Sequence, residues 1–124
     1  MEPDSLMMSA ATLLGIAGLG GLLMAVMRLI GVMRPPAWLA MVHGFLAAAA
    51  LALLSYAAWA VKIPPMAQFA LALLLAAAAT GAAMNLLFHW KLQPLPIPLM
   101  IVHAMLAVVG FILLLTAIFW KSVP

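Results

Sequence analysis

The last apolar stretch of the chain, residues 97–120, reads IPLMIVHAMLAVVGFILLLTAIFW and contains no charged side chain. A helix that crosses the hydrocarbon core of a membrane needs about 20 predominantly apolar residues. Three further stretches meet this requirement, at about 7–32, 37–61 and 66–90, and Arg28 is the one charged residue within them. The sequence therefore predicts four transmembrane helices.

Prolines separate the four stretches. They occur at Pro35-Pro36, at Pro64-Pro65 and at Pro94 and Pro96. Proline cannot continue a helix, and it restricts the residue before it. The connections are short, so neighbouring helices must run in opposite directions. We expect an all-α, polytopic membrane protein, an antiparallel four-helix bundle that forms one transmembrane domain over residues 1–124.

The composition excludes several classes of protein. Of the 124 residues, 70% are hydrophobic and 6% are charged, and there is no cysteine. Soluble chains are about 45–50% apolar and about 25% charged. A soluble enzyme, a nucleic-acid-binding domain, a disulfide framework, a thiolate metal site and a covalently attached c-type haem are therefore excluded. The expected surroundings are a lipid bilayer, with no nucleic-acid partner.

The few basic residues lie near the ends of the predicted helices and bear on orientation. Arg28, Arg34 and Lys91 belong to the side of the first and third connections, whereas Lys62 and Lys121 belong to the opposite side with the acidic N-terminus. Cytoplasmic loops of membrane proteins carry an excess of Lys and Arg. We expect a bacterial inner-membrane protein with both termini outside the cytoplasm. The acidic start does not resemble a secretory signal, so the first helix should be retained.

The two halves of the sequence align when the chain is shifted by 60 residues. Residues 36–47 fall on residues 96–107 with six of the twelve positions identical, and the matches include Pro36 with Pro96 and His43 with His103. Proline and histidine are rare in this chain, so these matches carry the most weight. We interpret residues 6–62 and 66–122 as two copies of a two-helix unit. Such copies form a parallel repeat about an axis along the membrane normal.

The repeat places two histidines at the same depth in the membrane. His43 and His103 each follow the matched proline by seven residues. At about 1.5 Å per residue, both lie about 10 Å below the same surface. The second and fourth helices should be diagonal in the bundle, so the two side chains would face each other across the core.

Other polar residues gather on the same side of the membrane. Counted back from the connections, Arg28 should lie near the depth of His43, with His89 and Asn85 in the same leaflet. Polar side chains are costly in lipid and tend to mark functional sites. This group is therefore the candidate site.

Two facing histidines are suited to binding a b-type haem, with His43 and His103 as the axial ligands. Arg28 would pair with a haem propionate, and Asn85 or His89 would orient an axial imidazole or a propionate. Haem would be held without covalent attachment, since cysteine is absent. Small residues on the histidine faces would give the macrocycle room: Ala47, Ala50, Ala107 and Gly110.

The same residues allow other interpretations. Intramembrane histidines commonly form hydrogen bonds between helices, each worth about 0.6 kcal/mol. His89 and Arg28 would then extend to the headgroups, and Asn85 would form a hydrogen bond across the bundle. A third interpretation is a Cu(I) site, in which the repeat-related Met24 and Met84, expected about a turn deeper than the histidines, supply thioether ligands.

Residues 94–111, PLPIPLMIVHAMLAVVGF, resemble a motif of small, uncharacterised four-helix bacterial membrane proteins. The likeness covers mainly this motif and its fainter copy around His43. The layout also resembles that of membrane-bound b-type cytochromes, whose haem-binding histidines lie on helices of a four-helix bundle. That resemblance is architectural, since no diagnostic cytochrome signature is present.

The leading hypothesis is a small membrane-embedded b-type cytochrome that passes electrons between a quinone or reductase and a partner. The alternative is a structural or assembly subunit of a membrane complex, or a small oligomeric transporter. No nucleophile, acid–base pair or phosphate-binding loop is visible, so the sequence gives no sign of catalysis by the chain alone.

Overall fold

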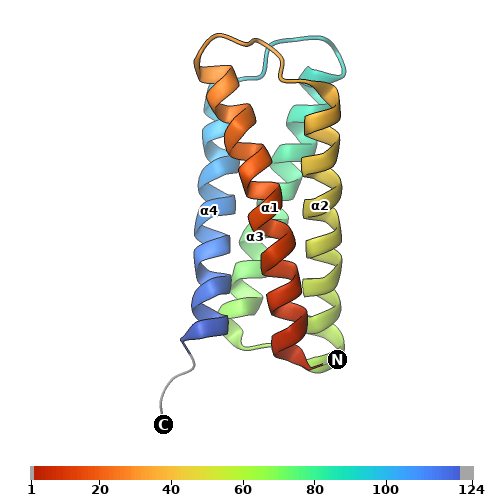
Figure 1. Cartoon of the computed structure of the whole chain (residues 1–124), viewed down its shortest axis with the longest axis vertical. Coiled ribbons are helices and arrows are strands. Elements are labelled where there is room, and N and C mark those ends of the chain that lie inside the picture. Colours follow the sequence, from red (N-terminus) through yellow and green to blue (C-terminus); the bar gives the residue numbers. More distant parts are fainter. Residues whose placement is uncertain (1, 121–124) are drawn as a thin grey trace.

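Four long helices make up the fold of residues 2–120, which the computed structural model describes. They are α1 (Pro3–Leu29), α2 (Ala37–Tyr56), α3 (Pro65–Met84) and α4 (Ile97–Phe119). Helices α2 and α3 each continue into one π-helical turn, η1 (Ala57–Val61) and η2 (Asn85–His89). This part of the chain contains no strand. Successive helices run in opposite directions along one long axis (Figure 1).

Each helix is long and apolar enough to cross a membrane, which confirms the expected number of spans. The mean hydropathy of the most apolar part is 2.0 in the first three spans and 2.6 in the fourth. Only 17–22% of that part is buried inside the bundle. Most of the apolar surface therefore faces outward, as expected when the solvent is lipid.

The boundaries of α1 differ from the expected span of 7–32. The helix begins at Pro3, because proline is compatible with the first helical turn. It ends at Leu29, because Gly31 adopts a positive φ of 106° and the Val32 amide donates to the carbonyl of Met27. A glycine of this kind after the last turn is a common helix stop.

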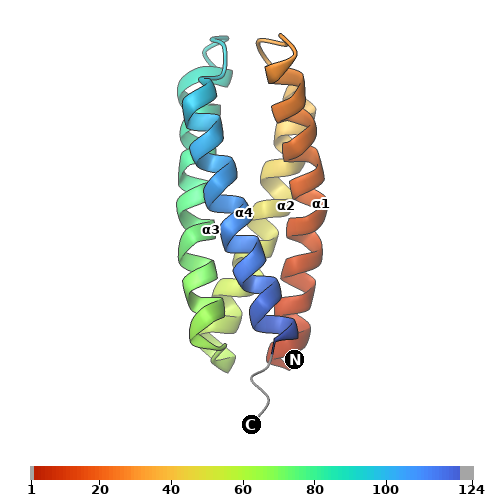
Figure 2. The same cartoon turned by 90° about the vertical axis from the view of Figure 1, so that its left-hand side faces the viewer.

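The bundle is built from two hairpins. Helix α1 packs along α2, and α3 packs along α4, whereas the contacts between the hairpins, α1 with α4 and α2 with α3, are fewer. Helices α2 and α4 lie on opposite sides of the bundle, with α1 and α3 between them (Figure 1). Figure 2 shows that the hairpins are close together near the N-terminus and diverge toward the first and third connections.

The half of the bundle near the N-terminus contains the apolar core, and we call it the closed half. Its buried residues are Leu6, Met7, Ala10, Ala11, Ala50, Leu51, Leu54, Ala57, Ile63, Ala67, Ala70, Leu74, Leu114, Ala117 and Ile118. Matched positions of the repeat are buried to the same extent. Ala10 matches Ala70 and Leu54 matches Leu114, and all four are fully buried. The half toward the first and third connections, where the hairpins diverge, is the open half.

Two of the small residues expected to make room for a cofactor instead pack in the closed half. Ala50 is fully buried in the apolar core. A Cβ atom at Gly110 would lie 2.9 Å from Cγ of Leu74 and 3.3 Å from the carbonyl oxygen of Ala70. Both positions are seven residues past a histidine, which is about 10 Å further from the connections. They let the helices approach each other rather than line a site.

We predict that Gly110→Ala destabilises the bundle by about 1–3 kcal/mol, because the added methyl group overpacks the contact with α3. Gly44→Ala is the matched control, since nothing lies within 4 Å of a Cβ atom there. The free energy of unfolding in mixed micelles measures both effects. An equal effect of the two substitutions would contradict the close contact at Gly110.

Candidate functional site

A cavity of about 840 Å³ lies between the hairpins in the open half. Residues of all four helices line it, and most of their side chains are apolar. Four lining side chains are polar: His43, Asn85, His89 and His103. A mainly apolar cavity with a few polar groups is the usual form of a small-molecule site. This cavity is therefore the candidate site.

His43 of α2 and His103 of α4 meet in this cavity from opposite sides of the bundle. Their ring centroids are 6.1 Å apart, and the ring planes make an angle of 75°. Both residues are partly exposed to the cavity. The structure thus brings together the two histidines that the repeat places at matched depth.

Each histidine is held by a backbone carbonyl of the other helix in its own hairpin. His43 Nδ1 lies 2.7 Å from the Ala17 oxygen, and His103 Nδ1 lies 2.7 Å from the Ala77 oxygen. A carbonyl oxygen can only accept, so Nδ1 must carry the proton and donate. In a neutral ring Nε2 then has a free lone pair. Within residues 2–120, neither Nε2 has a hydrogen-bond partner.

Two glycines at matched positions of the repeat leave the space that the two imidazole rings occupy. A Cβ atom at Gly21 would lie 2.9 Å from Cε1 of His43, and one at Gly81 would lie 2.9 Å from Cε1 of His103. Any side chain at these positions would push the ring off the helix backbone. The glycines therefore allow each imidazole to reach the carbonyl one turn earlier on the neighbouring helix.

No side-chain pattern in the sequence indicates that the carbonyls of Ala17 and Ala77 are the partners of the histidines. We expected Asn85 or His89 to orient an imidazole, but the backbone holds both rings. Alanine gives no side-chain signal for such a role. The sequence feature that could have indicated these carbonyls is a repeated spacing, because an alanine precedes a glycine by four residues at 17–21 and again at 77–81.

The second hairpin is more polar than the first around its histidine. Thr80 Oγ1 lies 3.4 Å from His103 Nδ1 and donates to the same carbonyl of Ala77, at 2.8 Å. The matched position in the first hairpin is Gly20. The two histidines are therefore similarly oriented but have different surroundings.

Asn85 and His89 line the cavity between His103 and the third connection. They follow Gly81 by four and eight residues, so they lie about one and two helical turns nearer to the connection. Their side chains form no hydrogen bond with any other residue that the structure describes. They are free to contact a molecule in the cavity.

Arg28 lies at the open end of the bundle and not near the depth of His43. It follows Gly21, on which His43 rests, by seven residues, so it lies about 10 Å nearer to the connection. The expected depth was wrong because α1 ends at Leu29, well before the proline from which the depth was counted. Arg28 Nε donates to the carbonyl oxygen of Leu95 at 2.9 Å. This bond joins the two hairpins.

The remaining residues of the haem and copper hypotheses line the same cavity. Ala47 and Ala107 line the cavity, as expected. Met24 and Met84 also line it. They lie three residues past Gly21 and Gly81 toward the connections, so they are nearer to the surface than the histidines and not deeper. Residues 2–120 contain no group of three or more His, Cys, Asp or Glu side chains that could hold a metal ion.

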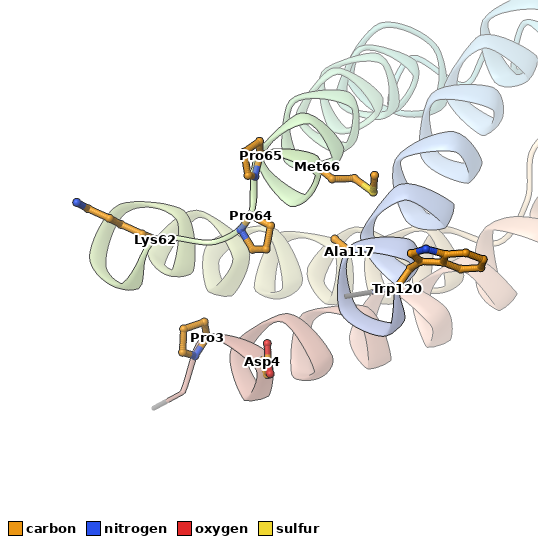
Figure 3. Close-up of a pocket in the computed structure, with 8 residues that line it drawn as sticks. All are labelled: Pro3, Asp4, Lys62, Pro64, Pro65, Met66, Ala117 and Trp120. Atoms are coloured by element: carbon orange, nitrogen blue, oxygen red, sulfur yellow. The ribbon is translucent and has the colours of Figure 1, made fainter. Parts of the chain in front are cut away.

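A second hollow, of about 560 Å³, lies at the closed end of the bundle. It is bounded by Pro3, Asp4, Lys62, Pro64, Pro65, Met66, Ala117 and Trp120. Figure 3 shows the Lys62 side chain pointing away from the other residues. The charged groups do not converge on this hollow, so it is a weaker candidate than the cavity between the histidines.

Comparison with protein-family models, curated proteins and solved structures finds no match to this chain. The cavity and its side chains are therefore the basis on which a function can be proposed.

We predict that Gly21→Ala destabilises the protein by about 1–3 kcal/mol, because the methyl group displaces the His43 ring and breaks its hydrogen bond. Gly18→Ala is the control, since Gly18 lines the same cavity and nothing lies within 4 Å of its Cβ position. The free energy of unfolding is the measurement. In a His43→Ala background the Gly21→Ala effect should disappear, and a persistent effect would contradict the proposed clash.

Proposed function

We propose that this protein is a small membrane-embedded b-type cytochrome that relays electrons between a quinone or reductase and a partner. His43 and His103 would be the axial ligands of one haem. The observation that carries the proposal is the pair of matched hydrogen bonds from Nδ1 to a backbone carbonyl. They leave both Nε2 atoms unprotonated, and an unprotonated imidazole nitrogen is what a metal binds.

The donor set and its spacing fit this role. Histidines that bind metals almost always donate their other ring N–H to a carbonyl, a carboxylate or water. The His43 and His103 ring centroids are 6.1 Å apart, so one bound group could contact both rings.

The cavity also fits a non-covalently bound macrocycle. Its volume of about 840 Å³ lies within the usual range for ligand pockets, about 300–1,000 Å³. Ala47 and Ala107 keep the histidine faces small, and the other lining side chains are mainly apolar. The two rings therefore have mainly apolar surroundings. The absence of cysteine agrees with non-covalent binding.

Arg28 is placed to hold the anionic edge of such a group. Its bond to Leu95 uses Nε, and its terminal amino groups have no partner within residues 2–120. Arg34 and Lys91 lie at the same end of the bundle, whereas Glu2 lies at the other end. Guanidinium groups pair well with carboxylates, so Arg28 would hold a propionate at the mouth of the cavity.

A haem bound in this cavity would supply a one-electron redox centre in one half of the membrane. His43 and His103 would occupy both axial positions and so keep other ligands from the iron. Because both histidines lie in the open half, one such centre does not span the bilayer. A redox partner would therefore act in that half of the membrane.

The full-length protein, produced with a supply of haem, should show a Soret band and a sharp α band after reduction. His43→Ala and His103→Ala should each abolish this spectrum, because each removes an axial ligand. His89→Ala is the matched histidine control and should weaken the spectrum at most. A colourless protein from haem-replete cells would overturn the cytochrome proposal.

The methionines of the cavity support a copper site as the second candidate. Met24 and Met84 line the same space as the two histidines. Thioether and imidazole ligands together suit Cu(I). Met24→Leu combined with Met84→Leu should leave the haem spectrum unchanged if the histidines bind haem. Loss of stoichiometric copper in this variant would favour the copper site, within a structural subunit or an oligomeric transporter.

We further propose that the open end faces the cytoplasm of a bacterial cell and that both termini are outside. The chain has no cysteine, so single cysteines report orientation cleanly. Ser5→Cys should react with a membrane-impermeant maleimide added to intact spheroplasts, and Gln93→Cys should react only after lysis. The reverse pattern would show the opposite orientation, with the cavity opening outside.

A further inference from the structure

Asn85 and His89 are the two polar groups of the cavity that the proposed haem site leaves without a role. The carbonyls of Ala17 and Ala77 already orient the axial histidines. Neither Asn85 nor His89 has a side-chain hydrogen bond within residues 2–120, although both line the cavity. Polar groups in a membrane interior are costly unless they are satisfied, and they commonly mark a ligand path.

Among the residues that line the cavity on the connection side of the histidines, these two make one wall polar, and Arg28 lies beyond them at the mouth. The matched positions of the first hairpin are Ala25 and Leu29. Ala25 lines the cavity opposite them, with Leu22 nearby on the same helix. A ligand that fits here needs hydrogen-bonding groups along one edge and an apolar remainder.

The spacing and chemistry of the polar wall narrow the class of ligand. Asn85 and His89 are the first and last residues of η2, so they lie about one helical turn apart on the same wall. An amide group and an imidazole ring can each donate or accept a hydrogen bond. Two such groups match a ring with two oxygens, whether these are carbonyls or hydroxyls. Ala82 lines the cavity beside them, and its small side chain leaves space for a flat ring.

We infer that Asn85 and His89 form the binding site for the ring of a quinone or quinol at the mouth of the cavity. Such a ligand is lipophilic and reaches the site through the membrane. This inference rests on the proposed function, because a quinone there would be the redox partner of the haem. The binding itself does not require haem and is testable without it.

Trp90 supplies a local reporter for this site. It directly follows His89, and its amide donates to the carbonyl oxygen of Asn85 at 2.9 Å. Replacing Trp38, Trp59 and Trp120 by Phe leaves Trp90 as the single tryptophan. The full-length protein in phosphatidylcholine vesicles is titrated with a short-chain 1,4-benzoquinone, once haem-free and once haem-loaded, and quenching of Trp90 is recorded.

Saturable quenching is expected in both forms. Asn85→Leu and His89→Leu should each weaken binding about three- to tenfold, because each removes one hydrogen bond. His89→Gln retains a donor and an acceptor and should restore most of the affinity. Thr116→Val is the control, because the Thr116 hydroxyl lies in the closed half and donates to the Ile112 carbonyl of its own helix. This variant should bind the quinone as tightly as the parent protein does.

Three results would overturn the inference. Trp90 quenching does not saturate, the two leucine variants bind the quinone as tightly as the parent protein, or the quinone binds only to the haem-free form. The last result would mean that the quinone occupies the space of the haem. A protein that binds quinone at Asn85 and His89 but never takes up haem would retain this site and overturn only the cytochrome proposal.

Discussion

The hydrogen bond from each imidazole to a backbone carbonyl of the neighbouring helix is the interaction on which the open half depends. It forms because a glycine on that helix lets the ring lie directly against the backbone. The bond fixes the ring orientation and assigns the proton to Nδ1, and it joins the two helices of each hairpin. The same contact therefore supports both the local packing and the chemistry proposed for the cavity.

The two halves of the bundle differ in how closely their helices pack. In the closed half, Ala50 is buried in the apolar core and Gly110 lets α4 approach α3 within the second hairpin. In the open half the hairpins separate and leave a cavity, and the bond from Arg28 to Leu95 connects them across its mouth. A bundle packed tightly along its whole length would leave no space between the two histidines.

The repeat gives the protein two similar hairpins that have acquired different surroundings. His43 and His103 have matched partners at matched distances, so the duplicated unit itself creates the pair. Thr80, Asn85 and His89 belong to the second hairpin only, where the first has Gly20, Ala25 and Leu29. This difference makes one wall of the cavity polar, so the two matched histidines have unequal surroundings.

The sequence by itself determined the membrane environment, the four spans, the proline breaks and the matched positions of His43 and His103, because these follow from composition, length and repetition. Only the tertiary structure showed that backbone carbonyls hold the rings and that Ala50 and Gly110 belong to the core. It also placed Arg28 at the open end. Side-chain patterns do not reveal backbone acceptors, and depth depends on where a helix stops, which Gly31 decides before the prolines are reached.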